Sequence, residues 1–122
     1  MDLHDQHEKI NYIELPANDL DAIKAFFSQV FSFEFTDYGP EYSAFSAKSA
    51  GLEGGFFKAP LSASTHDGSA LIVFFSNALE ATQEKVAAAG AEINKQIFSF
   101  PGGRRFHFLD PCGNEWAVWS DS

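Results

Sequence analysis

The chain has 122 residues, a length that fits one domain with a hydrophobic core of its own. Its 17 acidic and 8 basic residues give a formal net charge of −9, which disfavours binding to nucleic acids and to anionic membrane surfaces. The one cysteine excludes an internal disulfide, and no apolar run approaches the length of a membrane span or of a signal peptide's apolar region. We therefore expect a cytoplasmic protein.

The first half of the chain predicts one helix among four strands. Asn18 is the expected N-cap of the helix, and Asp19 and Asp21 lie in its positively polarised first turn. Apolar residues with helical spacing define its buried face: Leu20, Ile23, Phe27, Val30 and Phe31. Strand-like runs occupy about 9–15, 33–37, 42–48 and 54–58.

The second half of the chain repeats this order after a small, polar connector at 60–69. Asn77 and Glu80 resemble a capping box, Leu79 and Val86 mark the buried face of a second helix, and Gly90 ends it. Strand-like runs lie at about 70–76, 91–98, 104–109 and 115–119.

The two halves correspond when the sequence is shifted by 59 residues. This shift places Asn18 on Asn77 and Leu20 on Leu79, so the order strand, helix, three strands occurs twice. Neither half can bury its helix and sheet alone, and we expect the two to share a core. The fold class predicted is α+β, with one module at about 8–59 and another at about 70–120.

A tight turn joins the last two predicted strands. It reads Asp110-Pro111-Cys112-Gly113-Asn114, in which Asp-Pro starts a turn and Gly113 supplies a positive φ. With this corner, the strand-to-helix entry at 13–20 and the Ala-Ala-Gly-Ala segment at 88–91, the chain resembles the vicinal oxygen chelate superfamily. That superfamily includes glyoxalase I, bleomycin-resistance proteins, fosfomycin-resistance enzymes and extradiol dioxygenases. In the details of its sequence, the chain is most similar to a bacterial glyoxalase-like branch of undefined activity.

The resemblance implies that two tandem βαβββ modules curl their sheets into a cup, often around a divalent metal. The four metal-ligand positions of the family fall on Tyr12, Gly55, Leu71 and Ala117. These side chains are poor ligands or have no donor atom, so we expect no family metal site and no cofactor. The alternative is a displaced site that uses Glu53 or Glu115, each two residues from an expected carboxylate.

Strand alternation predicts which side chains line the cup. By resemblance to substrate-contacting positions of fosfomycin-resistance enzymes, Arg105 and His107 also point inward. His107 is the candidate general acid or base, with Glu14 as the carboxylate that fixes its tautomer. The alternative is a strand histidine bonded to a backbone carbonyl. The other expected ligand-binding residues are Tyr12, Glu14, Val73, Phe75, Arg105, Glu115 and Trp119.

Several of these side chains have two readings. Arg105 either clamps an anionic group or stays at the surface, and Tyr12 either donates to the ligand or fills the space of a lost metal. Glu14 and Glu115 either bind a cation with help from ring faces or lie exposed at strand ends. A deep aromatic pocket without an acid–base pair would favour a protein that sequesters its ligand. An acid–base pair within the pocket would favour an enzyme.

Three functions are consistent with the sequence. The preferred one is a small-molecule-binding protein that sequesters an aromatic or cationic compound, in the manner of bleomycin-resistance proteins. The second is a metal-independent lyase or isomerase that uses His107, and the third is an interaction module with a filled cup. The resemblance also implies a homodimer.

Overall fold

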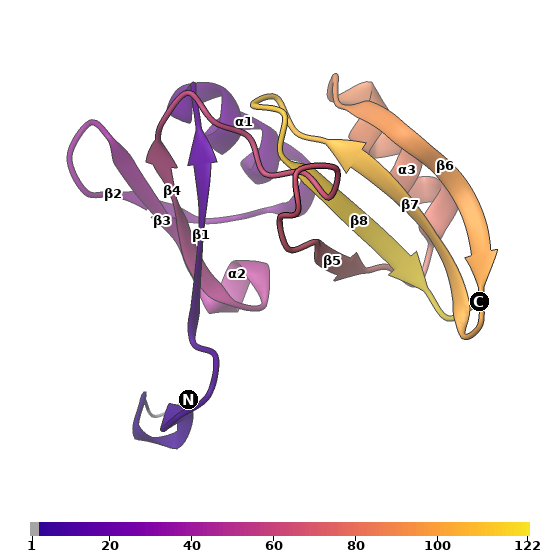
Figure 1. The fold of residues 1–122 in the computed structure, drawn as a ribbon, viewed down its shortest axis with the longest axis horizontal. Coiled ribbons are helices and arrows are strands. Elements are labelled where there is room, and N and C mark those ends of the chain that lie inside the picture. Colours follow the sequence, from indigo (N-terminus) through magenta and orange to yellow (C-terminus); the bar gives the residue numbers. More distant parts are fainter. Residues whose placement is uncertain (1–2) are drawn as a thin grey trace.

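The computed structural model describes residues 3–122, and it consists of two four-stranded sheets with helices between and behind them (Figure 1). The strand orders are β1-β4-β3-β2 and β5-β8-β7-β6. Strand β1 pairs in parallel with β4, and β5 pairs in parallel with β8. The α+β class with two repeated modules is therefore confirmed. The strands are β1 (Tyr12–Ala17), β2 (Phe35–Asp37), β3 (Tyr42–Phe45), β4 (Glu53–Lys58), β5 (Ile72–Phe75), β6 (Glu92–Phe100), β7 (Gly103–Leu109) and β8 (Glu115–Ser120).

The helices begin where the repeat predicts, but their caps differ from the prediction. Helix α1 (Leu20–Phe31) is capped by Asp19, whose carboxylate accepts from the Ala22 amide at 3.0 Å; the predicted cap, Asn18, lies one residue too early. Helix α3 (Leu79–Ala88) has Ala78 at its N-cap position and no side-chain cap, so the predicted role of Asn77 is wrong.

Two short elements have no counterpart in the sequence prediction. The run expected as one strand at 42–48 is strand β3 followed by a one-turn helix, α2 (Ala47–Ala50). The Ser46 side chain caps this helix by accepting from the Ser49 amide. A 3₁₀ turn, η1 (Leu3–Gln6), precedes β1 near the N-terminus.

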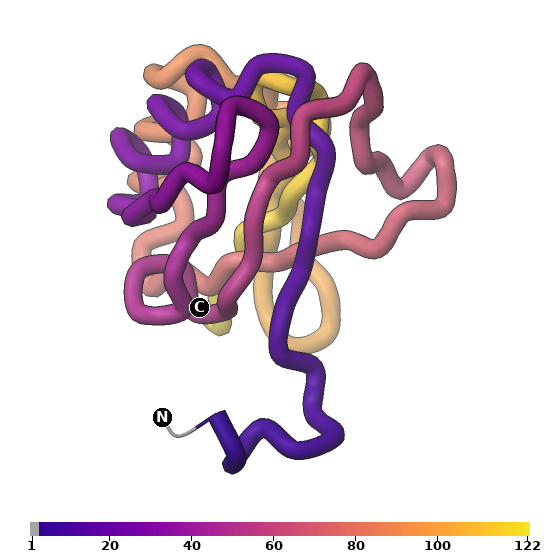
Figure 2. The backbone as a smooth tube through the Cα atoms, turned by 90° about the vertical axis from the view of Figure 1, so that its left-hand side faces the viewer, coloured from indigo at the N-terminus to yellow at the C-terminus, as the bar shows by residue number. Residues whose placement is uncertain are grey.

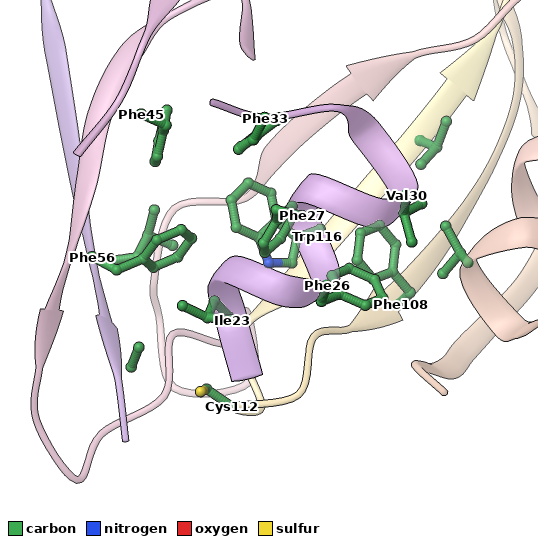
Figure 3. Close-up of a cluster of buried hydrophobic side chains, with 14 of the residues drawn as sticks. Ile23, Phe26, Phe27, Val30, Phe33, Phe45, Phe56, Phe108, Cys112 and Trp116 are labelled. Atoms are coloured by element: carbon green, nitrogen blue, oxygen red, sulfur yellow. The ribbon is translucent and has the colours of Figure 1, made fainter. Parts of the chain in front are cut away.

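Both sheets pack against α1, and this arrangement makes one shared core. The Phe27 ring on α1 lies 5.6 Å from the Phe56 ring of the first sheet and 4.9 Å from the Trp116 ring of the second. Figure 3 shows Phe56 on one side of α1 and Phe108 on the other. The expectation that neither module forms a core alone agrees with this packing.

The connector between β4 and β5 loops out on the side of the molecule away from the helices (Figure 2). It is fixed to the corner before β8, because the Ala63 amide donates to the Asn114 side chain and the Glu115 amide donates to the Ala63 carbonyl. The corner itself is organised by Asp110, whose carboxylate accepts from two backbone amides and from the Trp116 indole. No helix within residues 3–122 is long and apolar enough to cross a membrane.

Candidate functional site

Each sheet has one face against the shared core and one face turned away from it, which we call the open face. On the second sheet, strand alternation places Trp116 and Val118 in the core, with Ala117 and Trp119 on the open face. The register pairs Arg105 with Trp119, His107 with Ala117 and Val73 with Ala117, so these side chains share the open face.

Apolar side chains on this open face remain accessible. Val73 is 42% exposed, Phe75 is 55% exposed and Phe98 on β6 is 36% exposed. The Phe75 ring contacts the Trp119 ring at 5.2 Å, and the Phe100 ring lies 6.4 Å from Trp119. The second sheet thus presents a surface of aromatic rings that the core does not use.

His107 lies on the same face with its ring 5.9 Å from that of Phe98, and only 2% of its surface is exposed. Its Nδ1 lies 2.8 Å from the Glu115 Oε2 atom, so Glu115 orients the imidazole. The sequence predicts Glu14 for this task, and that prediction is wrong: Glu14 lies on the other sheet. Glu115 performs it because it starts β8 two positions from Ala117, the cross-strand partner of His107.

Glu115 is itself held by several donors. The Thr65 amide and hydroxyl both donate to Oε1 at 2.8 Å, and the Asn94 side chain donates to Oε2 at 3.4 Å. Burial alone would raise the pKa of Glu115, but the hydrogen bonds from Thr65, His107 and Asn94 outweigh it and lower the pKa to about 2. The carboxylate is therefore ionised at neutral pH and already engaged within the protein.

The Arg105 guanidinium packs against two aromatic rings and not against a carboxylate. Its guanidinium carbon lies 5.3 Å from the Phe98 ring centroid and 5.6 Å from that of Phe100. Within residues 3–122 it forms no ion pair, whereas its neighbour Arg104 binds Glu80 through two nitrogen atoms. The two arginines therefore differ: Arg104 joins β7 to α3 through Glu80, and the Arg105 guanidinium has no carboxylate partner in the described part of the chain.

The open face of the first sheet carries a pair of tyrosines. The Tyr12 and Tyr42 hydroxyl oxygens lie 2.6 Å apart, and Tyr12 is 43% exposed. Gly55 makes room for this pair, since a Cβ atom at that position would overlap the Tyr42 phenol. Burial raises the pKa of Tyr42, and the hydrogen bonds to Tyr12 and Glu14 act in the same direction.

The candidate residues thus form two groups, one on each open face. Tyr12, Glu14 and Tyr42 belong to the first sheet. Across the described part of the chain, no hydrogen bond, ion pair or ring contact joins them to the group on the second sheet. The second group comprises Val73, Phe75, Arg105, His107, Glu115 and Trp119.

A family model with the description "Glyoxalase/Bleomycin resistance protein/Dioxygenase superfamily" matches residues 9–118. The chain belongs to this superfamily. No curated protein matches the chain. Solved structures of the superfamily share its fold at low identity, and the following three are among the similar ones.

A glyoxalase-related enzyme from Fulvimarina pelagi is 18% identical, with a TM-score of 0.75 over 93% of this chain and 88% of that one. A glyoxalase/bleomycin resistance protein/dioxygenase family enzyme from Burkholderia phytofirmans is 19% identical, with a TM-score of 0.74 over 92% and 98% of the two chains. A mutant of the fosfomycin resistance protein FosX from Listeria monocytogenes, complexed with Mn(II) and 1S,2S-dihydroxypropylphosphonic acid, is 21% identical, with a TM-score of 0.75 over 94% and 91%. These likenesses concern the fold.

The residues at the four positions expected from the family resemblance to hold a metal do not fit a divalent cation. Leu71 and Ala117 have no donor atom, and Ala117 is fully buried. Gly55 has no side chain, and the Tyr42 phenol fills the space next to it. The Tyr12 hydroxyl is hydrogen-bonded to the hydroxyl of that phenol. Of the displaced alternatives, Glu115 is already bonded to His107 and Thr65.

Sequence reasoning missed three residues of these groups. Tyr42, Thr65 and Phe98 act through contacts with residues nine or more positions away in the chain. The aromatic content of the strands signalled Tyr42 and Phe98, whereas nothing in the sequence pointed to Thr65 in the connector. Gly55, at a position expected for a metal ligand, was a further clue to Tyr42. A glycine inside a strand often marks a place where a neighbouring group packs closely against the backbone.

Proposed function

We propose that this protein binds a small aromatic molecule on the open faces of its sheets, and that it does so without a metal ion. The observation that carries the proposal is the cluster of accessible rings over the second sheet, with Phe75 55% exposed and in contact with Trp119. Apolar and aromatic walls with a few placed polar groups are typical of small-molecule sites. Sequestration without chemistry is the simplest function that uses them.

The donor chemistry supports metal independence. The FosX structure contains Mn(II), whereas the positions expected here for metal ligands offer only a bonded phenol, a glycine and two aliphatic side chains. Tyr12 and Tyr42 occupy this region and hydrogen-bond to each other. Contact with the ligand on this side would therefore come from phenol groups and from Glu14.

A cup that includes both groups would need a second copy of the chain. Because α1 lies between the two sheets, each open face points away from the core that the sheets share. We propose a homodimer in which the first sheet of one copy and the second sheet of its partner enclose one ligand. The exposed Phe75 ring on β5 and the exposed Tyr12 on β1 support this arrangement.

A thermal-shift screen of aromatic compounds, with and without Mn²⁺, Ni²⁺ or Zn²⁺, tests the proposal. A ligand that binds only the folded state raises the unfolding temperature. We expect some aromatic compounds to stabilise the protein and the metals alone to have no effect. Phe75→Ala should weaken the stabilisation, while Leu61→Ala, at an exposed residue on the connector, should not. Stabilisation by a stoichiometric metal ion would contradict the metal-independent reading.

A second candidate is a metal-independent lyase or isomerase, and the His107–Glu115 contact of 2.8 Å favours it. A carboxylate that orients a histidine is a common arrangement for general acid–base catalysis. His107 is buried, and the ring atom left for a substrate to contact is Nε2, which has no hydrogen-bond partner within residues 3–122. Isotope exchange into bound ligands in D₂O, lost on His107→Asn, would support this function. Lack of binding by all compounds would favour an interaction module.

A further inference from the structure

Two buried nitrogen atoms on the open face of the second sheet have no hydrogen-bond partner within residues 3–122: Nε of Arg105 and Nε2 of His107. Buried polar atoms in folded proteins are nearly always hydrogen-bonded. The two residues stand two positions apart on β7, so their side chains leave the same face about 7 Å apart along the strand. One bound molecule could supply both missing partners.

The two nitrogens need partners of opposite kinds. Arginine has only donors, so Arg105 Nε needs an acceptor. Glu115 is ionised and therefore only accepts, so the proton of the His107–Glu115 hydrogen bond belongs to Nδ1. In the neutral imidazole, Nε2 then carries a lone pair and needs a donor.

We infer that this face binds a hydroxy acid, with its carboxylate on Arg105 and its hydroxyl donating to His107 Nε2. The inference rests on the proposed small-molecule function and names the class of ligand. A hydroxy acid places an anionic acceptor beside a hydroxyl donor, which is the combination the two nitrogens lack. The rings of Phe75, Phe98 and Trp119 lie around this place and would contact an apolar substituent.

The charge distribution supports an anionic ligand over a cationic one. Arg105 has no carboxylate partner although the protein carries a net charge of −9, and two rings fix its guanidinium. A ligand carboxylate would gain a charge-assisted hydrogen bond there. Glu115, the acidic residue nearest in this group, is already engaged by Thr65 and His107 and is not presented to a cation.

Calorimetric titration with three related compounds tests the inference: 3-phenyllactate, 3-phenylpropanoate, which lacks the hydroxyl, and 3-phenyllactamide, which lacks the charge. We expect 3-phenyllactate to bind most tightly. Arg105→Gln should weaken its binding by about 10-fold to 100-fold, the usual effect of losing a hydrogen bond to a charged group. The same substitution should change binding of the amide little.

Arg104→Gln is the matched control, because it removes the same charge from the neighbouring residue on the other side of the strand. An equal loss in Arg104→Gln, or an equal loss for the acid and the amide in Arg105→Gln, would overturn the carboxylate contact. Equal affinity for 3-phenyllactate and 3-phenylpropanoate would overturn the hydroxyl contact without any substitution at buried His107. If neutral aromatic compounds bind and all three probes fail, only this inference is wrong; if no aromatic compound binds, the proposed function fails as well.

Discussion

At the scale of single residues, Glu115 links the connector, β6 and β7 through one ionised carboxylate. Its pKa falls from 4.5 to about 2 on folding, so this group stabilises the protein above about pH 4.5 and loses that effect as the pH falls toward 2. A shift of this size corresponds to about 3 kcal/mol. We expect urea midpoints measured between pH 2 and pH 7 to fall steeply below pH 4.5.

Glu115→Gln should lower the midpoint at pH 7 and flatten this acid dependence, because an amide does not titrate in this range. Glu84→Gln, at an exposed residue of α3, serves as the control and should keep the wild-type profile. An unchanged slope in Glu115→Gln would show that other carboxylates cause the acid sensitivity.

Gly55 offers a second test at the residue scale. A Cβ atom there would overlap the Tyr42 phenol, so Gly55→Ala should displace Tyr42 and break its contact with Tyr12. The expected destabilisation is about 1–3 kcal/mol, which is typical of overpacking. In a Tyr42→Ser background the same change should cost almost nothing, since the overlapping atoms are gone. Similar costs in both backgrounds, measured by urea unfolding, would mean that backbone conformation is the reason for the glycine.

At the scale of elements, the entry to α1 distinguishes two candidate caps. Asp19 accepts from the Ala22 amide, whereas Asn18 makes no cap bond to the helix. Asp19→Ala should therefore destabilise the protein by about 1 kcal/mol in chemical unfolding. Asn18→Ala should have little effect, and the reverse order of effects would contradict the observed cap.

The elements that sequence reasoning located correctly are those with a strong local pattern. The Leu20 and Leu79 helix starts and the Asp110 corner follow from spacing and turn chemistry within a few residues. The inward direction of Arg105 and His107 was expected from the family resemblance, and the register of β7 and β8 puts both on one face with Trp119 and Ala117. Helix α2 was missed because Ser46 ends a strand-like run by capping a single turn, which leaves no periodic signal.

At the scale of the whole molecule, the shared core followed from the repeat, but the composition of the site did not. The partner of His107 depends on how β7 and β8 bring Glu115 beside it, and the connector adds Thr65 from 50 positions away. Local patterns hold no information on such contacts. The same holds for Tyr42, which meets Tyr12 across 30 positions.

The direction of the open faces leads to a prediction about assembly. Strands β1 and β5 are sheet edges with one neighbour each, and unpaired edges usually need to be covered. Pairing β1 of one copy beside β5 of another would cover both edges and bring the two open faces into one cup. We expect sedimentation to give a species of twice the 13.4 kDa chain mass. Phe75→Asp, on the exposed side of β5, should shift it toward monomer, while Leu61→Asp on the connector should not. A wild-type protein that stays monomeric at micromolar concentration would contradict the two-copy cup, and binding would then have to occur on the second sheet alone.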